Sequence, residues 1–290
     1  MGNLYNIAGH LVCIECDNSA VMDTLDGFKV FQIPLVGEAD VYIVLKDAKP
    51  LPIYGTLYHT IVTDVAISRF YYTEESFYMG IWRQNELRLS MQFERNSKKF
   101  HIQGELSPVL LRFALWVAFN LATIDTMTVA IHASAIIYKK QAFLFLGESG
   151  TGKSTHTRLI CQRYPEVELL NDDSPIIRVE NGECMVYGSP WSGKTACYKP
   201  IKFYLESVTR LHQAAVNKIS LLPLHNAIGA LLPSLPPELY LCPNFQTKVT
   251  SILSEIIEQV SVYSLECLPS ESAAELSLKT MTRTIRKWNK

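Results

Sequence analysis

Residues Phe143 to Thr155 read FLFLGESGTGKST, and the fold class of the chain follows from them. The first four residues are apolar and have the length and composition of a buried strand. From Gly147 to Ser154 the sequence fits G-x-x-x-x-G-K-[ST]. The residues from His156 to Tyr164 then have helical spacing. A strand, a glycine loop and a helix in this order are what a phosphate-binding P-loop requires.

The residue types of this loop suit phosphate binding. Glycines allow backbone N–H groups to turn toward phosphate oxygens, and the start of the following helix adds partial positive charge. Lys153 is expected to reach the β- and γ-phosphates, and the Ser154 hydroxyl is expected to ligate Mg²⁺. The predicted nucleotide-binding residues are Gly147, Ser149, Gly150, Thr151, Gly152, Lys153, Ser154 and Thr155.

Composition limits the classes of protein to consider. Of the 290 residues, 48% are hydrophobic and 19% are charged, which is typical of a soluble globular protein. The net charge of −1 supplies no basic field, so no nucleic-acid partner is expected. The start of the chain has no signal-peptide pattern, and the longest apolar stretch, Leu110 to Ala122, is interrupted by polar residues and is too short to span a bilayer. We therefore expect a cytoplasmic protein without a membrane partner.

Two further features are expected to be structural. Cys13 and Cys16 are the one close pair among seven scattered cysteines, and neither a second pair nor a histidine partner completes a zinc site. The C-terminal cations Arg283, Arg286, Lys287 and Lys290 complement the dipole of a last helix, although they could also meet an acidic partner.

Residues 1–105 are expected to form a β-rich N-terminal domain. Short runs of strand-forming residues alternate with polar turns, which is typical of an antiparallel meander. The aromatic residues of these runs are expected in the core and not on a ligand-binding face. The predicted strands are Leu11–Ile14, Phe28–Ile33, Val41–Leu45, Phe70–Tyr72, Phe77–Trp82, Leu87–Phe93 and Phe100–Ile102.

Residues 106–290 are expected to form the nucleotide-binding domain. Ser107 and Pro108 predict the start of a buried helix over Val109–Thr123, and a hairpin turning at Lys139-Lys140 leads into the P-loop. The remaining predicted strands are Val167–Leu170, Ile176–Val179, Cys184–Tyr187, Ile201–Val208 and Val262–Leu265, and the remaining helices lie within Lys218–Leu231, over Phe245–Val260 and after Pro269.

Two adjacent carboxylates, Asp172 and Asp173, follow the strand Val167–Leu170. We expect this strand to neighbour the P-loop strand, which would bring both side chains to the phosphates. In phosphoryl transfer one carboxylate helps to hold Mg²⁺ and another can accept the proton of an attacking hydroxyl. An N-cap or an Asx-turn is the structural alternative.

The order of His132, GESGTGKST and LLNDD resembles the HPr kinase/phosphorylase family and its relative, ATP-dependent phosphoenolpyruvate carboxykinase. In that pattern a histidine on a strand precedes the P-loop, and an aspartate pair ends the next strand. The resemblance covers roughly residues 125–265. It implies an α/β (α+β) fold with a compact HPr kinase/PEP carboxykinase-like P-loop core beside the β-rich N-terminal domain. The matching residues are His132, Gly147, Ser149, Gly150, Gly152, Lys153, Ser154, Asp172 and Asp173.

The resemblance also implies ATP, Mg²⁺ and transfer of the γ-phosphate to a hydroxyl. It gives Asp172 the role of base and places Asp173 with Ser154 at the metal, and the two aspartate roles can be exchanged. His132 would orient the aspartates or the phosphate. An ordinary strand histidine is the alternative.

One segment departs from the family's pattern. HPr kinases carry a signature after the aspartates whose glutamate contributes to the metal site, whereas residues 188–198 here read GSPWSGKTACY. This segment contains no acidic residue, so a third metal ligand is not identified. Lys194 could steady the transferring phosphate, and Trp191 and Gly193 are candidates for substrate contact. A structural turn with a buried Trp191 is the alternative.

These observations predict an ATP- and Mg²⁺-dependent kinase that phosphorylates a hydroxyl of a protein, a peptide or a small molecule. One alternative is a nucleotide-dependent regulatory or binding module without catalysis, which the missing acidic residue favours. Another is a PEP-carboxykinase-like enzyme, although no convincing set of carboxylate-binding arginines is present. Assembly into a homo-oligomer is left open.

Overall fold

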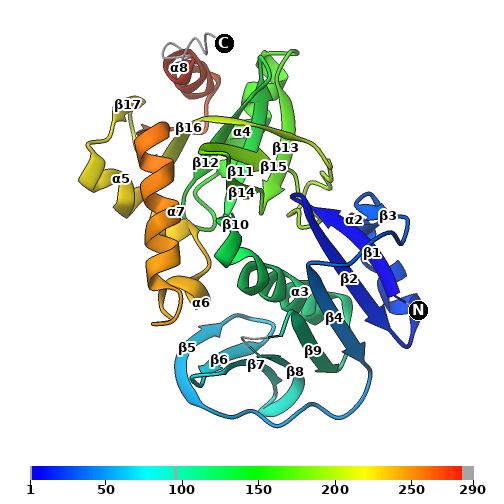
Figure 1. Ribbon diagram of the computed structural model, residues 1–290. Helices are drawn as coiled ribbons and strands as arrows, with labels where there is room; N and C mark the ends of the chain where they lie inside the picture. The colour runs from blue at the N-terminus through cyan, green and yellow to red at the C-terminus, as the bar shows by residue number, and fades with distance from the viewer. Residues whose placement is uncertain (1, 95–96, 283–290) are drawn as a thin grey trace. The chain divides into compact units, whose positions relative to one another are not determined.

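The computed structural model describes residues 2–94 and 97–282, which form a mixed α/β protein with two large sheets (Figure 1). The chain divides into two compact units. The first comprises Met1–Asp125 and Pro237–Thr247, and the second comprises Thr126–Pro236 and Lys248–Lys290. The basic cluster of Arg283, Arg286, Lys287 and Lys290 lies outside the described residues.

The first unit is built on a nine-stranded sheet in the order β3-β1-β2-β4-β9-β8-β7-β6-β5. The antiparallel meander is confirmed for β5 to β9, but β4 is parallel to both β2 and β9 and makes the sheet mixed. The strands are β1 (Gly2–Ile7), β2 (His10–Cys16), β3 (Gln32–Ile33), β4 (Val41–Lys46), β5 (Thr56–Val62), β6 (Ile67–Tyr72), β7 (Ser76–Arg83), β8 (Glu86–Glu94) and β9 (Lys99–Gly104).

The prediction of a strand over Phe28–Ile33 is wrong for the first half of that range. Asn18 caps α1 (Ser19–Asp23), and α2 (Asp26–Lys29) follows before β3 begins. The Phe28 side chain is buried and meets the Tyr5 ring edge-on at 5.6 Å between centroids. A short apolar run can be buried equally well by a helical turn or a strand, so periodicity alone does not separate the two.

Helix α3 (Pro108–Thr123) belongs to the first unit, with Pro108 at its first turn as expected. Its aromatic rings contact the sheet: Phe113 lies against Phe70 and Phe119 against His10. The two units therefore divide after α3, whereas the sequence suggested a boundary near residue 105. The helical run Pro108–Thr126 is long and apolar enough to cross a membrane, but 61% of it is buried, and the core helix of a soluble protein passes the same test.

A segment from late in the sequence completes this unit. Helix α6 (Pro237–Tyr240) is held by the Tyr58 hydroxyl, which donates to the Glu238 carbonyl at 2.9 Å. The Glu238 side chain is fully buried, and within the described residues no other side chain or backbone group hydrogen-bonds its carboxyl oxygens. Burial raises the pKa of this carboxyl to about 8 from 4.5.

The second unit has a nine-stranded sheet in which β10-β14-β15-β16-β12-β11-β13 form one path and β18 pairs with β16 and β17. The residues before the Lys139-Lys140 turn, which the sequence predicts as one strand over Thr128–Tyr138, form two strands separated at Ile131-His132. The strands are β10 (Thr128–Ala130), β11 (Ala133–Tyr138), β12 (Gln141–Leu146), β13 (Glu168–Asp173), β14 (Ile176–Glu180), β15 (Glu183–Tyr187), β16 (Lys202–Gln213), β17 (Lys218–Leu221) and β18 (Ser261–Cys267). The helices are α4 (Lys153–Arg163), α5 (Leu224–Leu231), α7 (Gln246–Gln259) and α8 (Glu271–Met281).

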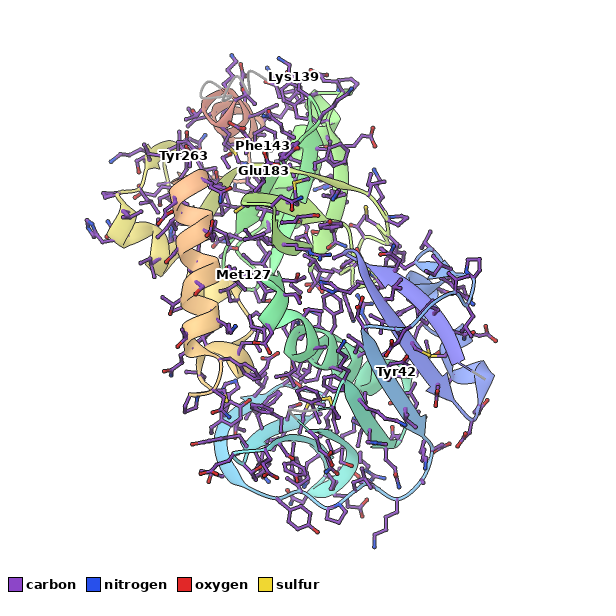
Figure 2. The ribbon with its side chains drawn as sticks, in the orientation of Figure 1. Tyr42, Met127, Lys139, Phe143, Glu183 and Tyr263 are labelled. Atoms are coloured by element: carbon purple, nitrogen blue, oxygen red, sulfur yellow. The ribbon has the colours of Figure 1, made fainter. Side chains whose placement is uncertain are left out.

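The side chains of β12, the strand that leads into the P-loop, alternate between two buried faces of the sheet. Phe143 and Phe145 point to one face and pack with Ile160 of α4 and Leu278 of α8 in a buried cluster. Lys139 lies at the tip of the β11–β12 hairpin, and Phe143 lies inside the unit (Figure 2). Because the side chains of this strand are buried on both faces, the P-loop starts from a rigid element.

We expect Glu238→Gln to change the pH dependence of stability. The folded state keeps this carboxyl protonated above pH 4.5 whereas the unfolded state releases the proton, so wild-type stability should fall as the pH rises from about 4.5 to about 8. The variant lacks this slope. Denaturant unfolding across this pH range measures it, with the exposed Glu75→Gln as control. Parallel profiles for wild type and Glu238→Gln would contradict the assignment.

Candidate active site

The edge of the second sheet brings together two chain segments distant in sequence. The sequence suggested that β13 neighbours the P-loop strand β12. This prediction is wrong, because β11 lies between the two strands. Since β11 is antiparallel to both, β12 and β13 run in the same direction and end at the same edge. The aspartates at the end of β13 therefore still meet the P-loop that follows β12.

Glycines shape the P-loop as expected. Gly147 has φ +153°, and a Cβ there would lie 2.5 Å from the Thr151 hydroxyl oxygen. Gly150 and Gly152 also have positive φ, and a Cβ at either would meet no atom within 4 Å. The Thr151 hydroxyl donates to the Glu148 carbonyl at 2.8 Å and closes the turn. The open space beside Gly150 and Gly152 is what a backbone cradle for phosphate needs.

Lys153 begins α4, and its side chain is largely buried. Its ammonium donates to the carbonyls of Gly147 at 2.8 Å and Glu148 at 3.2 Å, and it lies 3.0 Å from His132 Nε2. Burial lowers the pKa of this amine, while the charges of Asp173 and Asp172 act in the opposite direction. The carboxylates thus favour the charged lysine that phosphate binding requires.

Asp172 links three elements. Its Oδ1 accepts hydrogen bonds from Ser154 at 2.9 Å and from Ser134 of β11. Its backbone carbonyl accepts from the Gly193 N–H at 2.5 Å. The side chain is nearly fully buried, so these contacts hold the carboxylate facing the hydroxyl of the P-loop serine.

Asp173 contacts His132 instead, with Oδ1 3.3 Å from Nδ1. Because the Lys153 ammonium can only donate, His132 Nε2 must accept from it, which leaves the proton on Nδ1 facing Asp173. Asp173 has φ 147°, a strained value for a residue with a side chain, and its backbone bridges to Ser192. The two aspartates therefore have different partners and different exposure.

A cavity of about 380 Å³ joins these groups. It is lined by His132, Ser149, Gly150, Gly152, Lys153, Ser154, Thr155, Asp172, Asp173, Gly193 and Lys194. Gly147 and Thr151, which were also predicted as binding residues, shape the loop from outside this lining. A Cβ on Gly193 would lie 3.0 Å from the Asp172 carbonyl, so this glycine permits the close approach of the 188–198 segment.

Trp191 does not face the cavity. Its side chain is 2% exposed, and its carbonyl accepts from the Asn171 amide at 3.0 Å. This burial favours the structural alternative for Trp191, in which the ring anchors the segment that carries Gly193 and Lys194. Substrate contact by Trp191 stays a prediction.

Sequence reasoning missed several residues around the cavity. Ser134 follows His132 by two positions on the same stretch, a spacing that could have indicated a shared strand face. Asn171 donates to the backbone of the 188–198 segment, and Arg210 of β16 pairs with Glu148. Nothing in the local sequence marks Asn171 or Arg210, since their partners are distant in sequence.

The residues present fit a nucleotide with Mg²⁺. The Ser154 hydroxyl and the Asp172 carboxylate are adjacent oxygen donors, which Mg²⁺ prefers. Within residues 2–94 and 97–282, no group of three or more His, Cys, Asp or Glu side chains could hold a metal alone. Phosphate oxygens and water would complete the coordination, the usual arrangement for Mg²⁺.

Comparisons with known proteins give only distant likenesses, all of them to solved structures. No family model matches the sequence, and no curated protein matches it. Among solved structures, the HPr(Ser) kinase/phosphatase from Coxiella burnetii is similar to this chain at 14% identity, over 53% of this chain and 93% of its own, with a TM-score of 0.31. A TM-score of this size does not establish a common fold.

We expect Trp191→Ala to destabilise the protein by about 3–5 kcal/mol, because it empties a buried site the size of an indole. Lys194→Ala, on the same segment but exposed, should stay within about 0.5 kcal/mol of wild type. Denaturant unfolding compares the two variants. Wild-type stability in Trp191→Ala would contradict the anchoring role of the ring.

Proposed function

We propose that this chain is an ATP- and Mg²⁺-dependent kinase that transfers the γ-phosphate to a hydroxyl of a protein, a peptide or a small molecule. The observation that carries the proposal is the convergence of Lys153, Ser154, Asp172 and Asp173 on one cavity. Those side chains are the set that phosphoryl transfer from a P-loop nucleotide uses. Positioning and charge neutralisation would supply most of the rate.

The partners of the two aspartates favour the exchanged assignment of their roles. Asp172 touches Ser154 and is buried, so it is the carboxylate placed to share Mg²⁺ with the serine hydroxyl. Asp173 is more exposed and contacts His132, so it is the one placed to take the proton of the acceptor hydroxyl. When bound, Mg²⁺ would neutralise phosphate charge.

His132 would orient Asp173 through its Nδ1–H. Its other nitrogen faces Lys153, so the histidine connects the base to the phosphate-binding lysine. Lys194 lines the same cavity, is exposed, and has no ion-pair partner among the described residues. It is therefore free to stabilise negative charge that develops on the transferring phosphate.

We expect Lys153→Met to weaken ATP binding by about a hundredfold, since a buried charge-assisted contact to phosphate is removed. Lys140→Met, at the far end of β12 in the hairpin turn, serves as the matched control and should bind like wild type. Calorimetric titration with ATP and Mg²⁺ measures both affinities. Wild-type affinity in Lys153→Met would refute nucleotide binding at this loop.

The two aspartate variants should separate binding from transfer. Asp173→Asn should bind ATP with wild-type Mg²⁺ dependence yet lose release or self-transfer of labelled γ-phosphate, because the base is gone. Asp172→Asn should need a higher Mg²⁺ concentration to bind ATP. The opposite pattern would restore Asp172 as base, and a wild-type protein that binds ATP without any turnover would favour a non-catalytic nucleotide-binding module.

A further inference from the structure

An arginine on the strand next to the P-loop contacts the loop directly. Strand β16 is parallel to β12, and Arg210 lies opposite Leu146, the residue before the loop. The Arg210 guanidinium is 2.5 Å from Glu148 Oε1 and also donates to the Ala230 carbonyl near the end of α5 at 3.0 Å. Three residues further along β16, Gln213 donates to the Gly150 carbonyl at 3.2 Å. The loop is therefore tied to β16 at two points.

Glu148 puts a negative charge in an unfavourable place for a phosphate-binding loop. Its side chain is 74% exposed, while that of Arg210 is 12% exposed and held by α5. The Glu148 carboxylate raises the pKa of Lys153 and the Arg210 charge lowers it, so both lie within electrostatic reach of the phosphate-binding lysine. Without Arg210, the Glu148 charge would repel a polyphosphate at the loop.

We propose that Arg210 is a positioning residue that sets the nucleotide affinity of the P-loop by neutralising Glu148 and holding it against β16. This inference rests on nucleotide binding at the loop, and it does not depend on any transfer of phosphate. Half-exposed ion pairs contribute little to folding stability. The effect of this pair is therefore on the ligand, whose several negative charges sense the uncompensated carboxylate.

Variants that remove the charge of Arg210, of Glu148 or of both test the proposal through their affinity for ATP. Arg210→Gln keeps a donor for the Ala230 carbonyl and loses the charge, so it should weaken ATP binding by about tenfold, equivalent to about 1.4 kcal/mol. Glu148→Gln should bind at least as tightly as wild type. The double variant Arg210→Gln/Glu148→Gln should return to within about twofold of Glu148→Gln, because no uncompensated carboxylate is left.

Two measurements separate an electrostatic effect of Arg210 on the nucleotide from mechanical support of the P-loop by its side chain. The loss in Arg210→Gln should decrease in the order ATP, ADP, AMP, and it should shrink when the salt concentration is raised. The matched control is Arg158→Gln, an exposed arginine on α4, which should bind all three nucleotides like wild type. Calorimetric titration of each protein with the three nucleotides, at low and high salt, provides all of these values.

The outcomes decide between the possibilities. A double variant as weak as Arg210→Gln, or an equal loss for ATP and AMP, would overturn the neutralising role. Wild-type affinity in Arg210→Gln would overturn the inference and leave the proposed kinase function untouched, whereas wild-type protein that binds no ATP would overturn both. If Arg210→Gln fails to fold, the charge exchange Glu148→Arg/Arg210→Glu replaces it and must keep ATP affinity within about twofold of wild type.

Discussion

The contact between the Ser154 hydroxyl and the Asp172 carboxylate is the interaction on which the site depends. Ser154 stands in the first turn of α4 and Asp172 near the end of β13, and Ser134 of β11, the strand between β12 and β13, donates to the same carboxylate oxygen. A buried carboxylate is stable only when its oxygens are hydrogen-bonded. The serines therefore fix the distance between the P-loop helix and the aspartate strand, and with it the shape of the cavity.

A second chain of contacts runs from Asp173 through His132 to Lys153. One ammonium group thus lies between the carbonyls of its own loop and an imidazole whose other side faces a carboxylate. These two series of contacts give the aspartates different environments: Asp172 is buried beside a hydroxyl, and Asp173 is more exposed beside a histidine. Two adjacent residues can take different chemical roles in this way, because environment decides what a carboxylate can do.

The segment 188–198 contributes to the lining of the cavity, and it is held in place by residues that do not line the cavity themselves. Asn171, buried under the strand end, donates to the carbonyl of Trp191, and the Trp191 ring is enclosed. The same segment then presents Gly193 to the Asp172 carbonyl and Lys194 to the cavity. Side chains fixed by packing behind the site hold the exposed ones in place.

The sequence by itself determined the P-loop, the β12–loop–α4 unit, the Lys139-Lys140 hairpin and most strands of both sheets, because glycine positions and apolar periodicity are local signals. It also marked Lys153, Ser154 and the aspartate pair, since their residue types stand at a fixed spacing or directly after a strand. Only the tertiary structure decided that β11 separates β12 from β13, that β4 is parallel to its neighbours, that Trp191 is buried and that Arg210 meets Glu148. Each of these depends on pairing between segments far apart in the chain, where the free energy comes from packing and not from local conformational preference.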